Sequence, residues 1–447
     1  MFPRRMKTGN YSARYRCING CGTHPLTAVL YRCPRCGDLL EVEHDLDALR
    51  SRSPEQWKTL FADRRQHLRG PLASGVWSKQ EWVCPEIDEA NIVSLAEGWT
   101  PLLEAPHLAR TAGAGKVWVK LCGNSHTGSF KDLGMTVLVS MVKQMIADGQ
   151  QIKAVACAST GDTSAALAAY CAAAGIPALV LLPRNKVSTA QLIQPIANRA
   201  LTLSLDTDFD GCMRLIQQLT KSEEIYLANS LNSLRIEGQK TVAMEIVQQL
   251  HWQVPDWVIV PGGNLGNISA LGKGFLEMHA VGLIDSLPRL VCAQAEKANP
   301  LFLSYQKGFA EFESRKAGKT LASAIQIGNP VSAKKAIRVL QQLNGVVEQA
   351  SEAELADAAA LADRDGLFVC PQTGVAVAAY QKLAARQEIR AQDQVVIIST
   401  AHGLKFVDTK VKYHEGRLPG QQPKFANRLL SLPADLAQIQ EALQRHL

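Results

Sequence analysis

The segment Trp257-Val258-Ile259-Val260-Pro261-Gly262-Gly263-Asn264-Leu265-Gly266-Asn267 joins an apolar run to a glycine-rich loop and then to a helical pattern. The apolar run predicts a buried strand, and the glycines predict a tight turn into the helix. Glycine lets the backbone approach an anion, and a helix start offers free N–H groups and a positive dipole end. The loop 262–267 therefore suits a phosphate group, although an ordinary strand-to-helix turn would have the same sequence features.

Similar apolar runs lie on both sides of this segment, and longer helical patterns separate them. The predicted strands are 117–120, 152–156, 178–182, 257–260, 290–293 and 395–398. The predicted helices include 132–147, 164–174, 234–249 and 374–385. This alternation is typical of an α/β fold, in which helices cover both faces of a parallel sheet.

The composition indicates a folded chain with a mild positive charge. Of 447 residues, 47% are hydrophobic and 20% are charged, which suffices for a sizeable core. The net charge of +7 forms no basic arm, so we expect no nucleic-acid partner. The first residues contain no apolar run and the cysteines number eleven, so we expect no disulfides and a reduced, cytoplasmic location.

One apolar stretch, 165–182, approaches the length of a membrane span. Gly175 and Pro177 interrupt it, and alanine dominates its first half. We therefore predict a buried helix, a turn and a short strand, and expect no membrane partner.

The chain divides into four predicted parts. Residues 1–50 form an N-terminal module, and the polar range 51–75, with prolines and arginines, forms a connector. Residues 76–430 form the main body, and 431–447 form a C-terminal helix behind a proline.

Three predicted strands end in loops rich in Gly, Ser, Thr and Asn, namely 159–164, 262–267 and 399–403. Ligands of open parallel sheets bind beyond the carboxyl ends of the strands. The three loops therefore predict one polar site with several backbone N–H donors.

Lys131 follows the small polar run Gly123-Asn124-Ser125-His126-Thr127-Gly128-Ser129-Phe130 and stands where a helical pattern begins. The positive end of a helix dipole disfavours a lysine cation. Such a lysine is either solvated at the surface or kept partly neutral, and a neutral amine can form a Schiff base with an aldehyde cofactor. The segment does not complete a Walker A motif, which argues against a nucleotide hydrolase.

Several stretches in the same order resemble the fold-type II pyridoxal-phosphate enzymes and, among them, the threonine synthase family. The matching stretches are 128–135, 158–166, 229–240, 261–267 and 399–406. The segments similar to its plant-type branch in particular are 74–79, 206–212 and 254–260. The resemblance covers about residues 75–415.

This resemblance implies the tryptophan synthase β-like fold, with two open parallel-sheet α/β subdomains. The smaller subdomain, about 132–235, would be inserted in the larger. The resemblance also implies an enzyme that uses pyridoxal 5'-phosphate to convert O-phospho-L-homoserine and water into L-threonine and phosphate. We expect a homodimer.

The roles of family residues transfer to matching positions. Lys131 would hold the cofactor covalently and then shuttle protons, and Thr400 would face the pyridine nitrogen. The residues implied to hold the cofactor phosphate are Gly262, Gly263, Asn264, Leu265, Gly266 and Asn267. The residues implied to bind the substrate carboxylate are Ser159, Thr160 and Thr163. The residues implied to bind the substrate phosphate are Asn229, Ser230, Arg235 and Lys240.

Two features depart from part of the family. The resemblance implies that Asp162 lies near the cofactor's phenolic oxygen, where many bacterial relatives have Asn and the plant-type branch has Asp. A carboxylate would repel a phenolate, so we expect Asp162 to be protonated or turned away. The segment 97–102 is similar to the bacterial entry motif, which argues against the activation by S-adenosylmethionine that characterises the plant-type enzymes.

The cysteines of the N-terminal module have the spacing Cys17-x3-Cys21 and Cys33-x2-Cys36, which is similar to a zinc ribbon. Four thiolates on two tight turns can converge on a tetrahedral zinc ion. The first pair is one residue longer than usual, and His24 is an alternative ligand. Four reduced cysteines without a metal are the other interpretation.

Two other functions compete with the synthase. A threonine dehydratase-like β-eliminase would use the same cofactor without a second phosphate site, so the segment 229–235 distinguishes it. A zinc-ribbon nucleic-acid-binding protein would need clustered basic and aromatic residues near the cysteines. Some are present, but the acidic segment 41–45 follows them.

Overall fold

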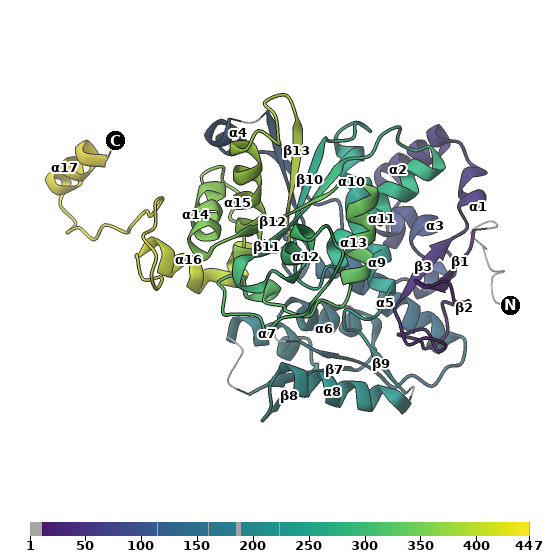
Figure 1. Ribbon diagram of the computed structural model, residues 1–447. Coiled ribbons are helices and arrows are strands. Elements are labelled where there is room, and N and C mark those ends of the chain that lie inside the picture. Colours follow the sequence, from purple (N-terminus) through teal and green to yellow (C-terminus); the bar gives the residue numbers. More distant parts are fainter. Residues whose placement is uncertain (1–10, 114, 160, 185–188, 223, 447) are drawn as a thin grey trace.

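A computed structural model describes residues 11–446 except 114, 160, 185–188 and 223 (Figure 1). The described strands form a six-stranded sheet, a four-stranded sheet and a small three-stranded sheet. The α/β fold predicted from the alternation of strands and helices is confirmed.

The larger sheet has the strand order β12-β11-β10-β13-β5-β4. Its strands are β4 (Leu102–Glu104), β5 (Lys116–Leu121), β10 (Trp257–Pro261), β11 (Arg289–Ala295), β12 (Val346–Ala350) and β13 (Gln394–Ser399). Neighbouring strands run parallel except for β4, which pairs antiparallel with β5 at the edge. The predicted open parallel sheet is present, with this one antiparallel edge strand.

The central strands of this sheet are apolar on both faces. On β10, Val258 and Val260 face a core that includes residues of α11 (Gly266–Val281), whereas Trp257 and Ile259 face another core with α15 (Pro371–Ala385). Successive side chains of a strand point to opposite faces, so a strand covered by helices on both sides needs a continuous apolar run.

The smaller sheet has the order β8-β7-β6-β9 with all neighbours parallel. Its strands are β6 (Ala154–Ala158), β7 (Ala178–Pro183), β8 (Leu201–Leu205) and β9 (Ile225–Leu227). All four lie within the range predicted for the inserted subdomain. The apolar stretch 165–182 folds as α6 (Asp162–Ala174), a turn at Gly175 with φ 70°, and β7, as the sequence predicts.

Figure 1 places the smaller sheet and its helices on one side of the larger sheet. The remaining helices of the body are α3 (Gln80–Val83), α4 (Pro106–Ala112), α5 (Lys131–Ala147), α7 (Thr189–Ala197), α8 (Phe209–Leu219), α9 (Leu234–Gln239), α10 (Thr241–Gln249), α12 (Pro300–Gln306), α13 (Ala333–Gln342), α14 (Glu352–Asp363) and α16 (Val407–His414). The predicted helix 234–249 is thus two helices, which meet at Lys240.

The N-terminal module pairs β1 (Ala13–Cys17) antiparallel with β2 (Thr23–Pro25) and with β3 (Leu40–His44), and α1 (Leu46–Arg50) follows. The range predicted as a connector contains α2 (Pro54–His67), on which Trp57 and Phe61 are fully buried. Two aromatic residues four positions apart lie on one helix face, and they fasten this range to the core of the body.

The C-terminal segment ends in α17 (Leu436–His446), which lies away from the body in Figure 1. Within the described part of the chain, no helix is long and apolar enough to cross a bilayer.

Candidate active site

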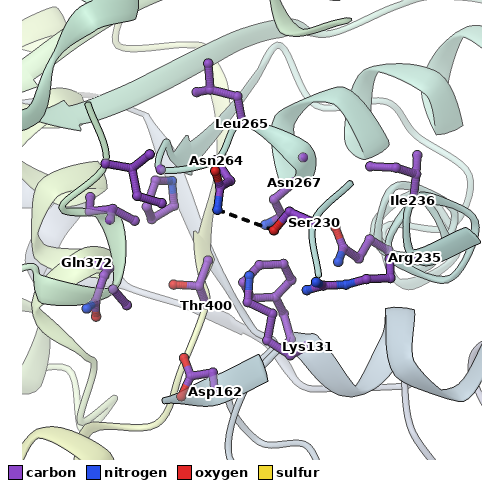
Figure 2. A pocket seen from close by; sticks show the side chains of 18 of the residues that line it. Lys131, Asp162, Ser230, Arg235, Ile236, Asn264, Leu265, Asn267, Gln372 and Thr400 are labelled. Carbon is purple, nitrogen blue, oxygen red and sulfur yellow. Dashed lines mark hydrogen bonds between the residues drawn. The ribbon is translucent and has the colours of Figure 1, made fainter. Parts of the chain in front are cut away.

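Most of the predicted site residues line one cavity (Figure 2). It lies at the carboxyl ends of strands of the six-stranded and the four-stranded sheets. Its empty space is about 720 Å³, a value that includes open solvent at the mouth. The predicted residues that line it are Lys131, Asp162, Ser230, Arg235, Gly263, Asn264, Leu265, Gly266, Asn267 and Thr400.

Lys131 is the first residue of α5 and enters the cavity from the loop that follows β5. The carboxylate of Asp132 fixes this loop, because it accepts hydrogen bonds from Ser125 Oγ and Thr127 N, each at 2.7 Å. The backbone N–H of Phe130 donates to Thr400 O at 2.9 Å, which joins the loop to the end of β13. The lysine is therefore held on a rigid turn.

Burial lowers the pKa of Lys131 from 10.5 to about 7, and the positive charge of Arg235 adds to this effect. The Nζ atom lies 4.2 Å from the centre of the Phe130 ring. A lysine of this pKa is substantially neutral near pH 7, as a nucleophilic amine must be. The interpretation of Lys131 as a solvated surface residue does not fit this environment.

The glycine-rich loop packs tightly between β10 and α11. A Cβ atom on Gly262 would lie 2.3 Å from Cys292 Sγ, so no larger residue fits there. Leu265 has φ 64°, and α11 begins at Gly266 without a side-chain cap. Asn264 Nδ2 donates to Ser230 Oγ at 3.3 Å (Figure 2), and the buried Asn267 Oδ1 has no partner. Uncapped N–H groups at a helix start suit an anion.

Arg235 is 3% exposed and lines the same cavity. Its Nη1 donates to Ala228 O at 3.1 Å, and its Nε has no partner. Burial lowers its pKa to about 10, so it stays a cation at neutral pH, and no carboxylate of the described residues pairs with it. A buried charge is normally paired, so the chemistry of this guanidinium suits an anionic ligand.

Asp162 and Thr400 complete the wall near Lys131 in Figure 2. Asp162 pairs with Lys405 Nζ at 3.2 Å, and the same ammonium donates to Thr127 O at 2.9 Å. The ion pair supplies a positive charge that offsets the carboxylate, and Asp162 lines the cavity rather than turning away from it. Thr400 is buried, and its N–H donates to Thr373 Oγ1 at 3.3 Å.

Other predicted residues do not line this cavity. Gly262 is not a lining residue, Ser159 directly follows β6, and Thr163 is the second residue of α6. The side chain of Asn229 is hydrogen-bonded to the backbone of Ala158. Ala158 N–H donates to Asn229 Oδ1 at 3.0 Å, and Asn229 Nδ2 donates to Ala158 O at 2.8 Å. The predicted Thr160 lies outside the described residues.

Lys240 is also placed elsewhere. Its Nζ lies 2.6 Å from carboxylate oxygens of both Glu237 and Glu277, and its side chain is fully buried. Two carboxylates already neutralise this ammonium, so we leave Lys240 out of the proposed substrate site.

Gln372, the second residue of α15, is a cavity residue that the sequence motifs did not predict. Its side chain lines the cavity, the residue is 2% exposed, and neither amide atom has a partner. A buried amide without hydrogen bonds costs free energy unless a ligand satisfies it. Pro371 was the available sequence signal, because proline is common at the first position of a helix and so marks Gln372 as a polar residue at a helix start.

These features together fit an aldehyde cofactor that carries a phosphate. The cavity offers a lysine with a lowered pKa, an uncapped helix start behind a glycine turn, and buried polar atoms without partners on Asn267 and Gln372.

The comparisons with known proteins agree with this chemistry. The sequence model of the family "Pyridoxal-phosphate dependent enzyme" matches residues 93–401. The chain therefore belongs to the pyridoxal-phosphate-dependent enzymes.

Its relatives narrow this class. The chain is 53% identical to Threonine synthase 2, chloroplastic, of Arabidopsis thaliana, over 98% of this chain and 86% of that protein. It is 39% identical to the threonine synthase of Methanocaldococcus jannaschii, over 90% of this chain and 95% of that protein. Within the class it belongs to the threonine synthases, which confirms the family predicted from the sequence motifs.

A solved structure agrees on the fold. The crystal structure of threonine synthase from Escherichia coli superimposes with a TM-score of 0.69 at 20% identity, covering 97% of this chain and all of that one. The predicted fold-type II architecture is confirmed.

Proposed function

We propose that this enzyme converts O-phospho-L-homoserine and water into L-threonine and phosphate. The observation that supports this substrate most directly is the buried, unpaired Arg235 in the same cavity as Lys131 and the glycine-rich loop. The loop suits the phosphate of the cofactor, and the guanidinium suits a second phosphate, which a simple β-eliminase does not need.

We propose that Lys131 holds the cofactor, that 262–267 bind its phosphate, and that Thr400 faces its ring nitrogen. Bound there, pyridoxal phosphate would delocalise the negative charge that forms when a proton leaves the substrate's α-carbon. The threonine hydroxyl carries no negative charge, so it would not hold that ring nitrogen protonated as a carboxylate would.

The chain's own groups would act on the substrate as follows. The Lys131 amine removes the α-proton and then a β-proton, for which its pKa of about 7 is suited. Arg235 and Ser230 bind the substrate phosphate, which leaves from the γ-carbon. A proton then returns to the γ-carbon, which becomes the methyl group, water adds at the β-carbon, and a proton returned to the α-carbon gives threonine. Ser159 and Thr163, at the start of α6, would receive the substrate carboxylate.

The experiment that tests this proposal incubates the purified enzyme, with cofactor, with O-phospho-L-homoserine, with L-threonine and with L-serine. We expect equal amounts of threonine and phosphate from the first substrate and little oxo acid from the other two. Rapid formation of 2-oxobutanoate from threonine, without formation of threonine from O-phospho-L-homoserine, would instead establish the dehydratase-like function.

The low pKa of Lys131 predicts how cofactor uptake depends on pH. Cofactor uptake by the cofactor-free enzyme should accelerate as pH rises through about 7, because only the neutral amine attacks an aldehyde. Arg235→Ala should move this midpoint to higher pH, since the guanidinium helps to lower the lysine pKa. Stopped-flow absorbance measures the uptake. A midpoint that stays unchanged in the variant would contradict the electrostatic coupling.

Two further features remain proposals: a homodimer and a cytoplasmic location. The C-terminal segment supports the homodimer, because Leu429, Leu436 and Ile439 expose apolar side chains that another copy could cover. Light scattering on the purified enzyme measures the oligomeric state.

A further inference from the structure

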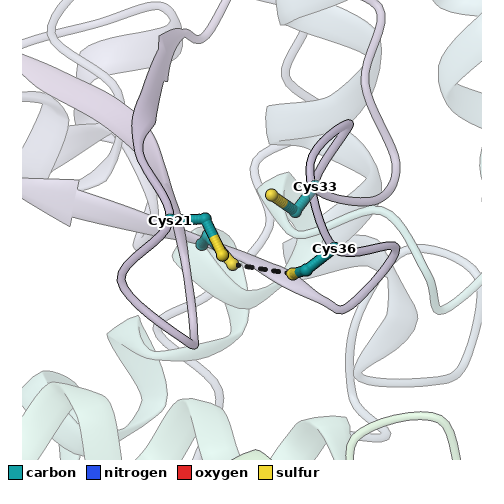
Figure 3. Close-up of side chains that lie close together, drawn as sticks. Cys21, Cys33 and Cys36 are labelled. Carbon is teal, nitrogen blue, oxygen red and sulfur yellow. Dashed lines mark hydrogen bonds between the residues drawn. The ribbon is translucent and has the colours of Figure 1, made fainter.

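The four cysteines of the N-terminal module converge on one point, away from the catalytic cavity. The Sγ atoms of Cys17, Cys21, Cys33 and Cys36 all lie within 4.8 Å of one another. Figure 3 shows the labelled sulfur atoms turned toward a common centre, and Cys17 Sγ lies 3.5 Å from Cys36 Sγ. Sulfur atoms around a tetrahedral zinc are about 3.8 Å apart, from a Zn–S bond of ~2.3 Å, whereas a disulfide needs ~2.05 Å.

Each cysteine pair sits on a turn that glycine makes possible. Gly20 has φ 74° and donates its N–H to Cys17 O at 2.9 Å, and Gly37 has φ 71° and donates to Cys33 O at 2.8 Å. The left-handed Gly20 accommodates the extra residue of the first pair. His24, the alternative ligand, is not part of the cluster.

Further hydrogen bonds suit sulfur atoms in the thiolate form. Asn19 donates its N–H to Cys17 Sγ at 3.4 Å and its Nδ2 to Cys36 Sγ at 3.7 Å. Four sulfur ligands match zinc and leave no open position, so such a site would be structural.

The module is fastened to the helix that carries Arg235. Leu40 O on β3 accepts hydrogen bonds from Ser233 Oγ and, at 2.5 Å, from Lys335 Nζ. His44 Nε2 lies 2.8 Å from Glu237 Oε2. Ser233 directly precedes α9 and Glu237 lies within it, so β3 holds this helix from the side opposite the cavity.

We propose that Cys17, Cys21, Cys33 and Cys36 bind one Zn²⁺, and that this metal holds β3 in the position that fixes α9 and Arg235. The part about Arg235 rests on the proposed function, whereas the metal site does not. The short strands of the module have few large apolar residues, so metal binding would supply folding free energy that their packing lacks.

The test begins with the full-length enzyme with its cofactor, purified under reducing conditions without added metal. Elemental analysis should find about one zinc per chain, and replacement by Co²⁺ should give thiolate-to-cobalt charge-transfer bands. Wild-type enzyme that lacks zinc and gives no such bands with Co²⁺ would overturn the metal site, whether or not it makes threonine.

The kinetic half of the proposal uses the Cys33→Ser/Cys36→Ser variant. It should lose the zinc and raise KM for O-phospho-L-homoserine several-fold, while the cofactor spectrum and kcat change little. Cys212→Ser, which alters a buried cysteine outside the cluster, should keep both zinc and KM. If the double variant does not fold, chelator-driven zinc release from the wild-type enzyme should raise KM instead. Zinc loss with unchanged KM would overturn the coupling to α9.

Discussion

Replacing Lys131 with alanine is expected to abolish threonine synthesis. The variant loses the amine that we propose both holds the cofactor and transfers protons at two carbon atoms. Loss of proton transfer alone costs roughly 10²–10⁴-fold in rate, and loss of the covalent attachment adds to it. Steady-state release of phosphate from O-phospho-L-homoserine measures the effect.

Lys143→Ala is the matched control, because Lys143 lies on the same helix α5 and outside the cavity wall. It should keep its activity. Borohydride reduction of the wild-type enzyme should fix the cofactor to the peptide that contains Lys131. A label on Lys405, the other lysine near Asp162, or an active Lys131→Ala variant would disprove the assignment.

The central strands and the meeting of the polar loops could be predicted from the sequence, for physical reasons. A parallel strand covered on both faces must be continuously apolar, so β10 and β13 are visible as runs of valine and isoleucine. Because the carboxyl ends of such strands share one edge, the loop 262–267 and Thr400 had to lie close together. Lys131 joins them because it follows β5, the neighbour of β13.

Short or edge strands were harder to predict. β8 is half-exposed, and β9 has only three residues, so neither presents an apolar run of the expected length. In α2 the apolar pair Trp57 and Phe61 stands among polar residues, which hid the helix within the range taken for a connector.

The roles of single polar residues depended on tertiary contacts that no local pattern reveals. Lys240 lies at the carboxyl end of α9, the helix that carries Arg235, yet its partner Glu277 comes from α11. Gln372 lies in the cavity only because α15 begins beside the end of β13. Composition and spacing cannot show which of two nearby cations finds a carboxylate and which stays unpaired.

Replacing Arg235 with alanine is expected to weaken the use of O-phospho-L-homoserine by about 2–5 kcal/mol in kcat/KM, the range for truncating one partner of a buried charge pair. The planar guanidinium can bind a phosphate through two parallel hydrogen bonds. Arg235→Lys should therefore recover only part of the loss, since it restores the charge without the fork. Initial rates over a range of substrate concentrations measure both variants.

The cofactor affinity of the Arg235→Ala variant shows whether Arg235 binds the substrate phosphate or the cofactor phosphate. If Arg235 binds the substrate, Arg235→Ala should retain pyridoxal phosphate with nearly unchanged affinity, and inorganic phosphate should inhibit it less than it inhibits the wild type. Arg289→Ala is a suitable control, because Arg289 is exposed at the amino end of β11, the edge of the sheet opposite the cavity. A variant that binds the cofactor much more weakly, and that inorganic phosphate inhibits as strongly as the wild type when cofactor is supplied in excess, would place Arg235 on the cofactor phosphate. The substrate phosphate would then need another partner in the cavity, where Ser230, Asn232 and Gln239 are the other polar lining residues of α9 and the loop before it.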